Sequence, residues 1–530
     1  MRSILFAGLD VSTQSCKLLV IDSDQGEVVF TDTVNYDSDL PQYKTYNGVI
    51  QGLGEGVSES DPQMWIDALM LLFDRLAQSS VRQELIRAIS VSGQQHGLVA
   101  LDTAGNLTRA RSKLWNDFST GEECDLLTRE VGGPDRMIEE VGNSQRTGYT
   151  AAKIFHFARH EPQAFERTAT LFLVHNFINW VLTGGKNGGI RVMEPGDTSG
   201  MALWNPKTRQ WSHPVLNAIS PDLMQKLPAV KPSDEFIGTI SGALAEKYGF
   251  SPECRIDAGS GDNMYGAVGT GNVEPGIVTI SLGSSGTAYT FMEHEFIDPS
   301  GEIAAFCDST GNHLPLLCVS NLANGYNDIL KEFSINHTQF NEIIRKTEPG
   351  NAGRVLIPWY MGERTPDVPL ASPTYFGFGI GDFTIENLCR AVLEGHVLNL
   401  YDGFRKMPVK AREIRLTGGL SQSPAWCQII ADVFEAETVP VEGAGAALGA
   451  ALHAAWVYAK MKTPGASLKE LVKPFVILNE SRRKKPEPQN LKIYRLQKEL
   501  FQNLSLRVRG VHSQADPFEI RKRLLDAATG

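Results

Sequence analysis

The stretch FAGLDVSTQSCK, at Phe6–Lys17, begins with an apolar run, reaches an acid at Asp10 and turns through hydroxyl and amide residues. A second apolar run follows, so the pattern predicts a β-hairpin with a polar turn. The stretch GIVTISLGSSGTAYTF, at Gly276–Phe291, follows the same plan around a Gly-Ser-Ser-Gly turn. Two similar hairpins in one chain predict an internally duplicated architecture.

The segments around the two hairpins alternate between helical and strand patterns. Apolar residues recur with helical spacing in some segments and form short β-branched runs in others, which predicts a mixed α/β fold. The predicted helices are Pro62–Ala77, Ala151–His160, Ile385–Leu400, Pro424–Phe434 and Gly443–Tyr458, and the predicted strands are Arg87–Val91, Thr170–Val174, Glu413–Leu416 and Thr438–Val441.

The length of 530 residues exceeds what one hydrophobic core can organise, so at least two domains are expected. A glycine-rich run after Cys254 predicts one boundary, and chain breakers at Ser481–Pro488 predict another. We therefore expect an N-terminal domain over 1–254, a C-terminal domain over 255–480 and a basic tail over 481–530. The tail holds 12 basic and 5 acidic residues, which fits either a solvated surface helix or a partner-binding arm.

The composition argues against several other classes of protein. The net charge of -11 at pH 7 disfavours a nucleic-acid-binding protein. Seven cysteines without a close CxxC pair indicate neither a disulfide framework nor a zinc ribbon. The apolar run Ile4–Leu9 is too short for a signal-peptide core, and no window is long enough to span a membrane. The sequence thus predicts a soluble cytoplasmic protein without a membrane partner.

Polar turns that follow strands are candidate phosphate sites. The turn after Asp10 and the turn within Ser281–Thr287 can present backbone N–H groups and hydroxyls to an anion, and the Asp10 carboxylate can hold magnesium through water. A third turn, LTGGLSQSP at Leu416–Pro424, leads from a buried strand into a helix N-terminus, which favours anions. Ordinary structural turns are the alternative at all three places.

Two common nucleotide-binding motifs do not occur in their standard form. The sequence contains no GxxxxGK[ST], and GAGAALG at Gly443–Gly449 has three residues rather than two before its last glycine. We interpret these small residues as a means of close helix packing. A dinucleotide site, as in a dehydrogenase, is the alternative.

Two further segments carry groups suited to catalysis and sugar binding. DAGSGDNMYGAVGTG, at Asp257–Gly271, places Asp262 and Asn263 among glycines, where a carboxylate is a candidate general base. SGQQHG, at Ser92–Gly97, offers amide and imidazole groups that can hydrogen-bond several hydroxyls. A purely structural histidine is the alternative there.

Eight motifs occur in one order along the chain: FAGLDVSTQSCK, SGQQHG, LWND, GDTSGM, GSGDN, SLGSSGT, GERTP and LTGGLSQS. In this combination the chain, over about residues 4–500, resembles the FGGY carbohydrate kinases, and among them most closely the D-xylulose kinases. The resemblance implies two ribonuclease-H-like domains, of the actin, Hsp70 and hexokinase type, around a central cleft. It also implies ATP and Mg²⁺ as cofactors, phosphorylation of D-xylulose to D-xylulose 5-phosphate, and a homodimer.

The resemblance also implies roles for individual residues. It makes Asp262 the catalytic base and Asp10 the acid that holds Mg²⁺ through water. The implied sugar contacts are Gln95, His96, Arg146, Asp262 and Asn263, and the implied nucleotide contacts are Thr13, Ser284, Ser285, Gly418, Gly419 and Ser423.

Other functions remain compatible with parts of this pattern. A kinase for another ketopentose or polyol, such as ribulose, would share the motifs. A non-catalytic actin- or Hsp70-like nucleotide switch would share the hairpins but would not need GSGDN or SGQQHG. A zinc hydrolase has less support than these functions. His156 and His160 are four residues apart on a predicted helix, as in a zinc-binding pair, but the glutamate that HExxH requires after the first histidine is missing.

Overall fold

The computed structural model describes residues 4–443, 445–512 and 515–529. The described residues fall into two compact units, each assembled from separate stretches of the chain. The first unit comprises Met1–Val273, Met292–Leu314 and Ala444–Val476, and the second comprises Glu274–Phe291, Pro315–Gly443 and Ile477–Gly530.

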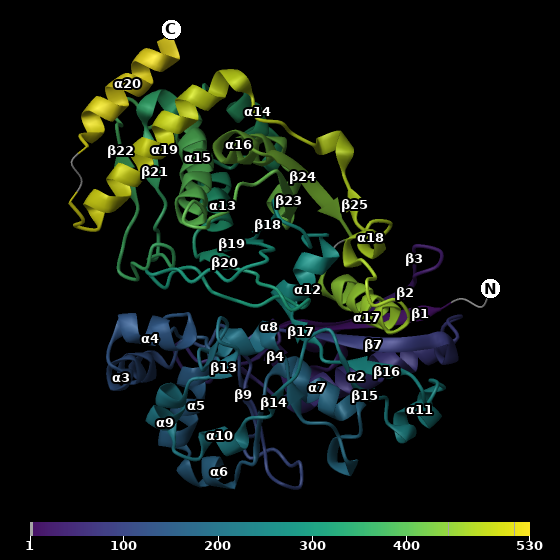
Figure 1. Ribbon diagram of the computed structural model, residues 1–530. Coiled ribbons are helices and arrows are strands. Elements are labelled where there is room, and N and C mark those ends of the chain that lie inside the picture. Colours follow the sequence, from purple (N-terminus) through teal and green to yellow (C-terminus); the bar gives the residue numbers. More distant parts are fainter. Residues whose placement is uncertain (1–3, 444, 513–514, 530) are drawn as a thin grey trace. The chain divides into compact units, whose positions relative to one another are not determined.

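A seven-stranded mixed sheet forms the centre of the first unit (Figure 1). Its strands in spatial order are β15 (Phe236–Thr239), β16 (Arg255–Asp257), β7 (Ile86–Gly93), β1 (Leu5–Val11), β2 (Ser15–Asp22) and β3 (Glu27–Asn35), with β17 (Ser260–Gly261) also paired to β7. β1, β2 and β3 form an antiparallel meander, whereas β7 pairs parallel with both β1 and β16. The hairpin predicted at Phe6–Lys17 is therefore confirmed as β1 and β2.

Helix α17 (Ala446–Lys462) packs on this sheet although it comes from a distant part of the chain (Figure 1). A Cβ atom at Gly8 of β1 would lie 2.0 Å from the carbonyl oxygen of Ala447. A Cβ atom at Gly449 would lie 1.8 Å from the carbonyl oxygen of Tyr265. Neither position has space for a side chain, so the predicted close packing holds at Gly449, whereas a Cβ atom at Gly443 or Gly445 would have no neighbouring atom within 4 Å.

The other helices of the first unit complete its core. α2 (Pro62–Ala77) has the predicted bounds and begins at Asp61, whose side chain accepts a hydrogen bond from the backbone N–H of Gln63. α3 and α5 belong to a second hydrophobic cluster, to which they contribute Leu127 and Phe157. The remaining helices of seven or more residues are α3 (Gly121–Val131), α4 (Pro134–Val141), α5 (Thr150–His160), α7 (Val174–Leu182), α9 (His213–Ile219), α11 (Gly242–Tyr248) and α12 (Asp262–Gly269).

The second unit contains a sheet in which, as in the first, an antiparallel meander is extended by two parallel strands. Its strands in spatial order are β20 (Leu316–Val319), β19 (Gly286–Thr290), β18 (Ile277–Leu282), β23 (Glu413–Thr417), β24 (Glu437–Glu442) and β25 (Ile477–Leu478). β18, β19 and β20 form an antiparallel meander, and β23 and β24 continue from β18 in parallel. The predicted duplication is confirmed for the meander and the two parallel strands of each sheet, whereas the outermost strand precedes its neighbour in the first sheet and follows it in the second.

Long helices cover the second sheet. The predicted helix Pro424–Phe434 is α16, and the predicted helix Ile385–Leu400 is the longer α15. The helices of the second unit are α13 (Ala323–Glu332), α14 (His337–Arg345), α15 (Ile385–Phe404), α16 (Pro424–Phe434), α19 (Pro488–Val508) and α20 (Pro517–Thr529).

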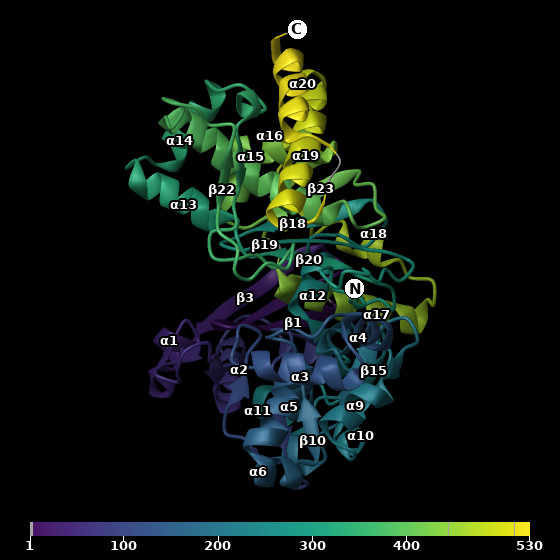
Figure 2. The same cartoon turned by 90° about the vertical axis from the view of Figure 1, so that its left-hand side faces the viewer.

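Within the basic segment 481–530, α19 (Pro488–Val508) and α20 (Pro517–Thr529) lie side by side (Figure 2). α19 buries Phe501, and its Tyr494 hydroxyl donates a hydrogen bond to Glu394 at 3.1 Å. Two of its cations, Arg495 and Lys498, pair with Glu435. Most of this segment is therefore an integral part of the second unit.

The compact units differ from the predicted ranges 1–254 and 255–480. The first unit continues to Val273, because β17 pairs with β7 and α12 follows β17 directly. The stretch Ala444–Val476 belongs to the first unit because α17 packs on its sheet. Glycine runs indicate turns, but they do not indicate which sheet a later helix covers.

All seven cysteines lie in described parts of the chain, and none of them forms a disulfide. Among the helices of the described residues, none combines the length and apolar character needed to cross a bilayer.

Candidate functional site

One edge of the first sheet gathers most of the predicted site residues of that unit. In the parallel pair β1 and β7, Asp10 is opposite Ser92, and β17 pairs Gly261 with Gly93. Parallel strands end at the same edge of a sheet, so the segments that follow β1, β7 and β17 start close together. These segments carry Thr13, the pair Gln95 and His96, and the pair Asp262 and Asn263.

Asp10 lies at the end of β1 within a group of hydroxyls. Its two carboxylate oxygens accept hydrogen bonds from Ser12 Oγ at 2.6 Å and Ser92 Oγ at 2.8 Å. Burial raises the pKa of Asp10 above its ordinary value of 3.8, although both hydroxyls and the charge of Lys17 act in the opposite direction. Carboxylate and hydroxyl oxygens are the ligand type that Mg²⁺ prefers, so this group of residues fits the predicted metal role.

Thr13 lies in the turn between β1 and β2, and Gln94 holds that turn. Thr13 Oγ1 donates to Gln94 Oε1 at 3.2 Å, and Gln94 Nε2 donates to the carbonyl oxygen of Ser12 at 3.3 Å. Trp115 Nε1, from the LWND motif, donates to Thr13 Oγ1 at 2.9 Å. Gln94 was not predicted as a site residue, although it stands next to Gln95 in SGQQHG.

Asp262 and Asn263 form the first turn of α12, directly after β17. Asn263 Nδ2 donates to Gln95 Oε1 at 2.6 Å and to Asp262 Oδ1 at 3.0 Å. Burial raises the pKa of Asp262 to about 7, and the negative charge of Asp10 raises it further. A carboxylate with a pKa near 7 is suited to proton abstraction at neutral pH.

His96 has a left-handed backbone with φ of 64°. Its carbonyl oxygen accepts hydrogen bonds from Lys153 Nζ at 2.7 Å and from Thr150 Oγ1 at 3.2 Å, both on α5. Burial lowers the pKa of Lys153 to about 7. The imidazole packs edge to face on Tyr149, with 4.9 Å between ring centroids. Helix α5 therefore positions the His96 turn.

Two buried carboxyl groups support this turn, and the sequence analysis assigned them no role. Asp197 belongs to the GDTSGM motif, and its Oδ1 lies 3.4 Å from both Gln95 Nε2 and the His96 backbone nitrogen. Glu194 accepts a hydrogen bond from the Asp197 backbone N–H at 2.8 Å. Burial raises the pKa of Glu194 to about 7 and that of Asp197 well above its ordinary value. Asp197 is thus a positioning residue for Gln95 and His96.

Arg146 is directed to a backbone carbonyl within the first unit. Its Nη2 donates to the carbonyl oxygen of Gly301 at 2.8 Å, and its Nε donates to Ser144 Oγ at 3.1 Å. The carbonyl oxygen of Arg146 accepts from the backbone N–H of Tyr149, the residue that packs on His96. Arg146 is therefore linked to the His96 turn by way of Tyr149. None of the hydrogen bonds described above joins Arg146 to Asp262.

The predicted nucleotide residues of the second unit also gather at one sheet edge. Ser284 and Ser285 are exposed in the turn between β18 and β19. In the parallel pair β18 and β23, Ser281 is opposite Thr417, so Gly418 follows at the same edge. A Cβ atom at Gly418 would lie 2.6 Å from the carbonyl oxygen of Leu282. A Cβ atom at Gly419 would have no neighbouring atom within 4 Å, which leaves its backbone open to a ligand.

Ser423 has a structural task at the start of α16. Its side chain caps the helix by accepting from the backbone N–H of Trp426, and its hydroxyl donates to Asn341 Oδ1 at 2.7 Å. Ser423 is nearly buried, with 7% of its surface exposed. The hydroxyl is therefore already engaged within the second unit.

The two sheets and their polar turns define a class of protein. Each unit has an antiparallel three-stranded meander extended by parallel strands, and hydroxyl- or glycine-rich turns lie at the edge where the parallel strands end. This is the ribonuclease-H-like fold of actin, Hsp70 and hexokinase. A carboxyl group of raised pKa at the edge of the first sheet, Asp262, is compatible with a phosphotransferase of this fold class.

Comparison with known proteins identifies the family. Residues 5–269 match the N-terminal domain of the FGGY family of carbohydrate kinases, and residues 323–458 match its C-terminal domain. The chain belongs to the FGGY family of carbohydrate kinases. The resemblance predicted from the motifs is therefore confirmed.

Three relatives illustrate the extent of the similarity. The xylulose kinase of Haemophilus influenzae is 33% identical over 92% of this chain and 97% of its own length. A "xyloylose kinase" from Brucella ovis has a TM-score of 0.83 and 23% identity over 96% of this chain and 99% of its own. A gluconate kinase from Lactobacillus acidophilus also has a TM-score of 0.83, with 21% identity over 95% of this chain and 98% of its own. The fold alone thus does not select the sugar.

The raised pKa of Asp262 predicts a pH-dependent gain of stability when its charge is removed. Because the folded-state pKa of about 7 exceeds the ordinary value of 3.8, folding favours the protonated acid, and stability is lost as the pH rises from about 4 to about 7. Asp262→Asn stays neutral and avoids this loss. We expect its melting temperature, relative to the wild type, to increase more at pH 8 than at pH 5. Asp125→Asn, at an exposed carboxylate, is the control, and an equal difference at both pH values would contradict the assignment.

Proposed function

We propose that this chain catalyses the ATP-dependent phosphorylation of D-xylulose to D-xylulose 5-phosphate. The observation that carries the proposal is the hydrogen-bonded group Asp262, Asn263 and Gln95, in which the acid has a pKa of about 7. Family membership supports sugar phosphorylation. The similarity to a xylulose kinase along 97% of that protein's length supports D-xylulose as the sugar.

In the proposed reaction Asp262 accepts the proton of the terminal sugar hydroxyl. The hydroxyl oxygen attacks the γ-phosphorus of ATP in line, the bond from that phosphorus to the bridging oxygen breaks, and ADP leaves. Asn263 and Gln95 hydrogen-bond the sugar hydroxyls and hold the terminal oxygen near the base. His96 adds a further contact from a turn that Lys153 and Asp197 hold in place.

Arg146 is proposed as a further sugar contact. Its guanidinium already bonds a backbone carbonyl, so it would offer its remaining N–H groups to the substrate.

Nucleotide contacts are proposed for each unit by itself. In the first unit Thr13, and in the second unit Ser284 and Ser285, have hydroxyls and turn amides that can bind phosphate groups. Gly418 and Gly419 allow the nucleotide to approach the backbone, and Ser423 contributes by fixing the first turn of α16.

Asp10 is the residue that would hold Mg²⁺ through water, supported by Ser12 and Ser92. The bound ion supplies positive charge against the negative charge of the phosphoryl oxygens.

Removal of the base gives the direct test of this mechanism. Asp262→Ala is expected to lower kcat for D-xylulose by about 10²- to 10⁴-fold, because general base catalysis typically contributes that much. The affinity for ATP should change little, since the proposed nucleotide contacts are other residues. A coupled ADP-release assay and ATP titration calorimetry measure the two quantities. Asp125→Asn serves as the control, and near wild-type turnover of Asp262→Ala would show that another group is the base.

Substrate preference distinguishes the proposed kinase from related ones. We expect the highest kcat/KM for D-xylulose in a panel that also contains D-ribulose, gluconate and glycerol, because hydrogen bonds from Gln95, His96 and Asn263 discriminate hydroxyl orientation. The panel is measured by ADP release, with a control that lacks sugar. A higher kcat/KM for another sugar would reassign the substrate but retain the kinase. ATP turnover that no sugar increases would instead favour a nucleotide switch.

A further inference from the structure

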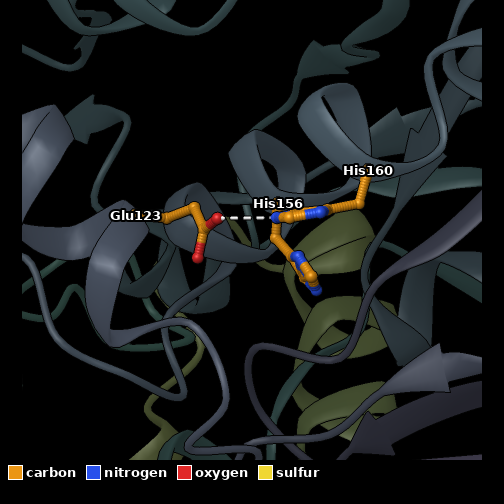
Figure 3. Close-up of side chains that lie close together, drawn as sticks. All are labelled: Glu123, His156 and His160. Atoms are coloured by element: carbon orange, nitrogen blue, oxygen red, sulfur yellow. Dashed lines mark hydrogen bonds and ion pairs between the residues drawn. The ribbon is translucent and has the colours of Figure 1, made fainter.

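Two histidines that our sequence analysis set aside meet a glutamate from another helix. His156 and His160 lie one turn apart on α5, and Glu123 reaches them from α3 (Figure 3). One ring nitrogen of each histidine and one carboxylate oxygen lie within 4.8 Å of one another. The HExxH pattern requires the glutamate on the same helix as the histidines. The spacing of His156 and His160 was therefore visible in the sequence, but their proximity to Glu123 on α3 was not.

One hydrogen bond joins two residues of the cluster, and a ring nitrogen of the third has no hydrogen-bond partner among the described residues. Glu123 is buried, with 2% of its side chain exposed, and its Oε1 accepts from His160 Nε2 at 3.2 Å when that nitrogen carries the proton. The two imidazoles lie edge to face with 4.2 Å between their centroids. The Nδ1 atom of His156 is buried and has no hydrogen-bond partner among the described residues. A buried ring nitrogen without a partner is available to a ligand.

We propose that Glu123, His156 and His160 form a binding site for a divalent transition metal of the Zn²⁺ type. Two imidazole nitrogens and one carboxylate oxygen are a ligand set that favours Zn²⁺, Ni²⁺ or Cu²⁺ over Mg²⁺ and Ca²⁺. In a tetrahedral site with bonds of about 2.0–2.1 Å, the ligand atoms lie roughly 3.3–3.5 Å apart. The ligand atoms here lie within 4.8 Å of one another, so the widest pair needs to close by at most about 1.5 Å. The His160 side chain is half exposed and can move, and water fills the fourth position.

The charged groups around the cluster set its affinity. Arg159 Nη1 lies 2.7 Å from Glu123 Oε1 and competes with a metal for that oxygen. Arg159 also pairs with Glu122 at 2.8 Å, so it keeps a carboxylate partner when a metal binds Glu123. Burial lowers the pKa of His156, with Glu123 acting in the opposite direction and His160 and two nearby cations, Lys113 and Arg109, in the same direction. A neutral imidazole is the form that binds metal.

The cluster lies on the helix that positions the sugar-site turn. Lys153 and Thr150, which hold the His96 carbonyl, are on α5 one and two turns before His156. A metal bound by α3 and α5 would therefore tie together two helices of the first unit and fix the helix behind His96. The site is separate from the oxygen ligands at Asp10, which suit Mg²⁺.

Metal titration of the full chain tests the proposal. Zn²⁺ affinity is measured by competition with a chromophoric chelator in Mg²⁺-containing buffer, and the visible spectrum of bound Co²⁺ reports the ligands. We expect His156→Ala and His160→Ala each to weaken Zn²⁺ binding by more than about 10-fold, since even loss of a group outside the ligand set costs that much. Zn²⁺ should raise the melting temperature of the wild type but not of these variants.

Two matched variants control the experiment. His294→Ala removes an exposed histidine outside the cluster and should leave Zn²⁺ affinity unchanged. Arg159→Met removes the competing cation and should strengthen binding. Melting temperatures without metal show that each variant is folded. Because the His160 side chain is half exposed, we expect His160→Ala to destabilise the fold less than His156→Ala. Zn²⁺ affinity that is equal in the wild type and His160→Ala, or no preference for Zn²⁺ over Mg²⁺ in the wild type, would overturn the proposal.

Discussion

Parallel pairing of two strands that end in polar turns is the constraint on which both units depend. In the first sheet it brings Asp10 of β1 to the same edge as the segment after β7, and β17 adds Asp262 to that edge. In the second sheet the pairing of β18 with β23 brings the serine turn beside Gly418. Each edge thus gathers groups from distant parts of the chain, and any shift in register would separate them. The same crowding keeps Asp262 near the charge of Asp10, which contributes to its raised pKa.

Charge is distributed unevenly, and the structure gives a local reason for it. The body of the chain is acidic, and the segment 481–530 is basic. Arg495 and Lys498 of that segment pair with Glu435. The hydrogen bond from Arg495 has the largest effect on the pKa of Glu435, and together with the hydrogen bond from Lys498 it lowers this pKa to about 2. The basic charges therefore neutralise acids of their own unit. In the proposed reaction the negative charge of ATP has to be met by turn amides, hydroxyls and the cation that Asp10 would hold, rather than by a broad basic surface.

Local patterns predicted the elements well, because hairpins, capped helices and apolar runs depend on neighbours in the sequence. The bounds of α2 and α16 are those predicted, and the hairpin at Phe6–Lys17 is present. The motif resemblance predicted the family, and most of the residues that it named lie at one edge of each sheet. It did not predict the return of α17 to the first sheet or the supporting roles of Asp197 and Lys153, because burial and contacts over long sequence separations decide these. The proximity of Glu123 to His156 depends on the packing of α3 against α5, which the sequence pattern does not predict.

In the proposed reaction Asp262 is the general base, and burial and the charge of Asp10 raise its pKa. The pH dependence of kcat/KM for D-xylulose at saturating ATP and Mg²⁺ measures whether this group has to be ionised. We expect kcat/KM to fall about tenfold per pH unit below a pKa of about 7, because the protonated acid cannot accept the hydroxyl proton. An activity that stays constant down to the ordinary carboxyl pKa of 3.8, or an unchanged profile in Asp262→Asn, would contradict it.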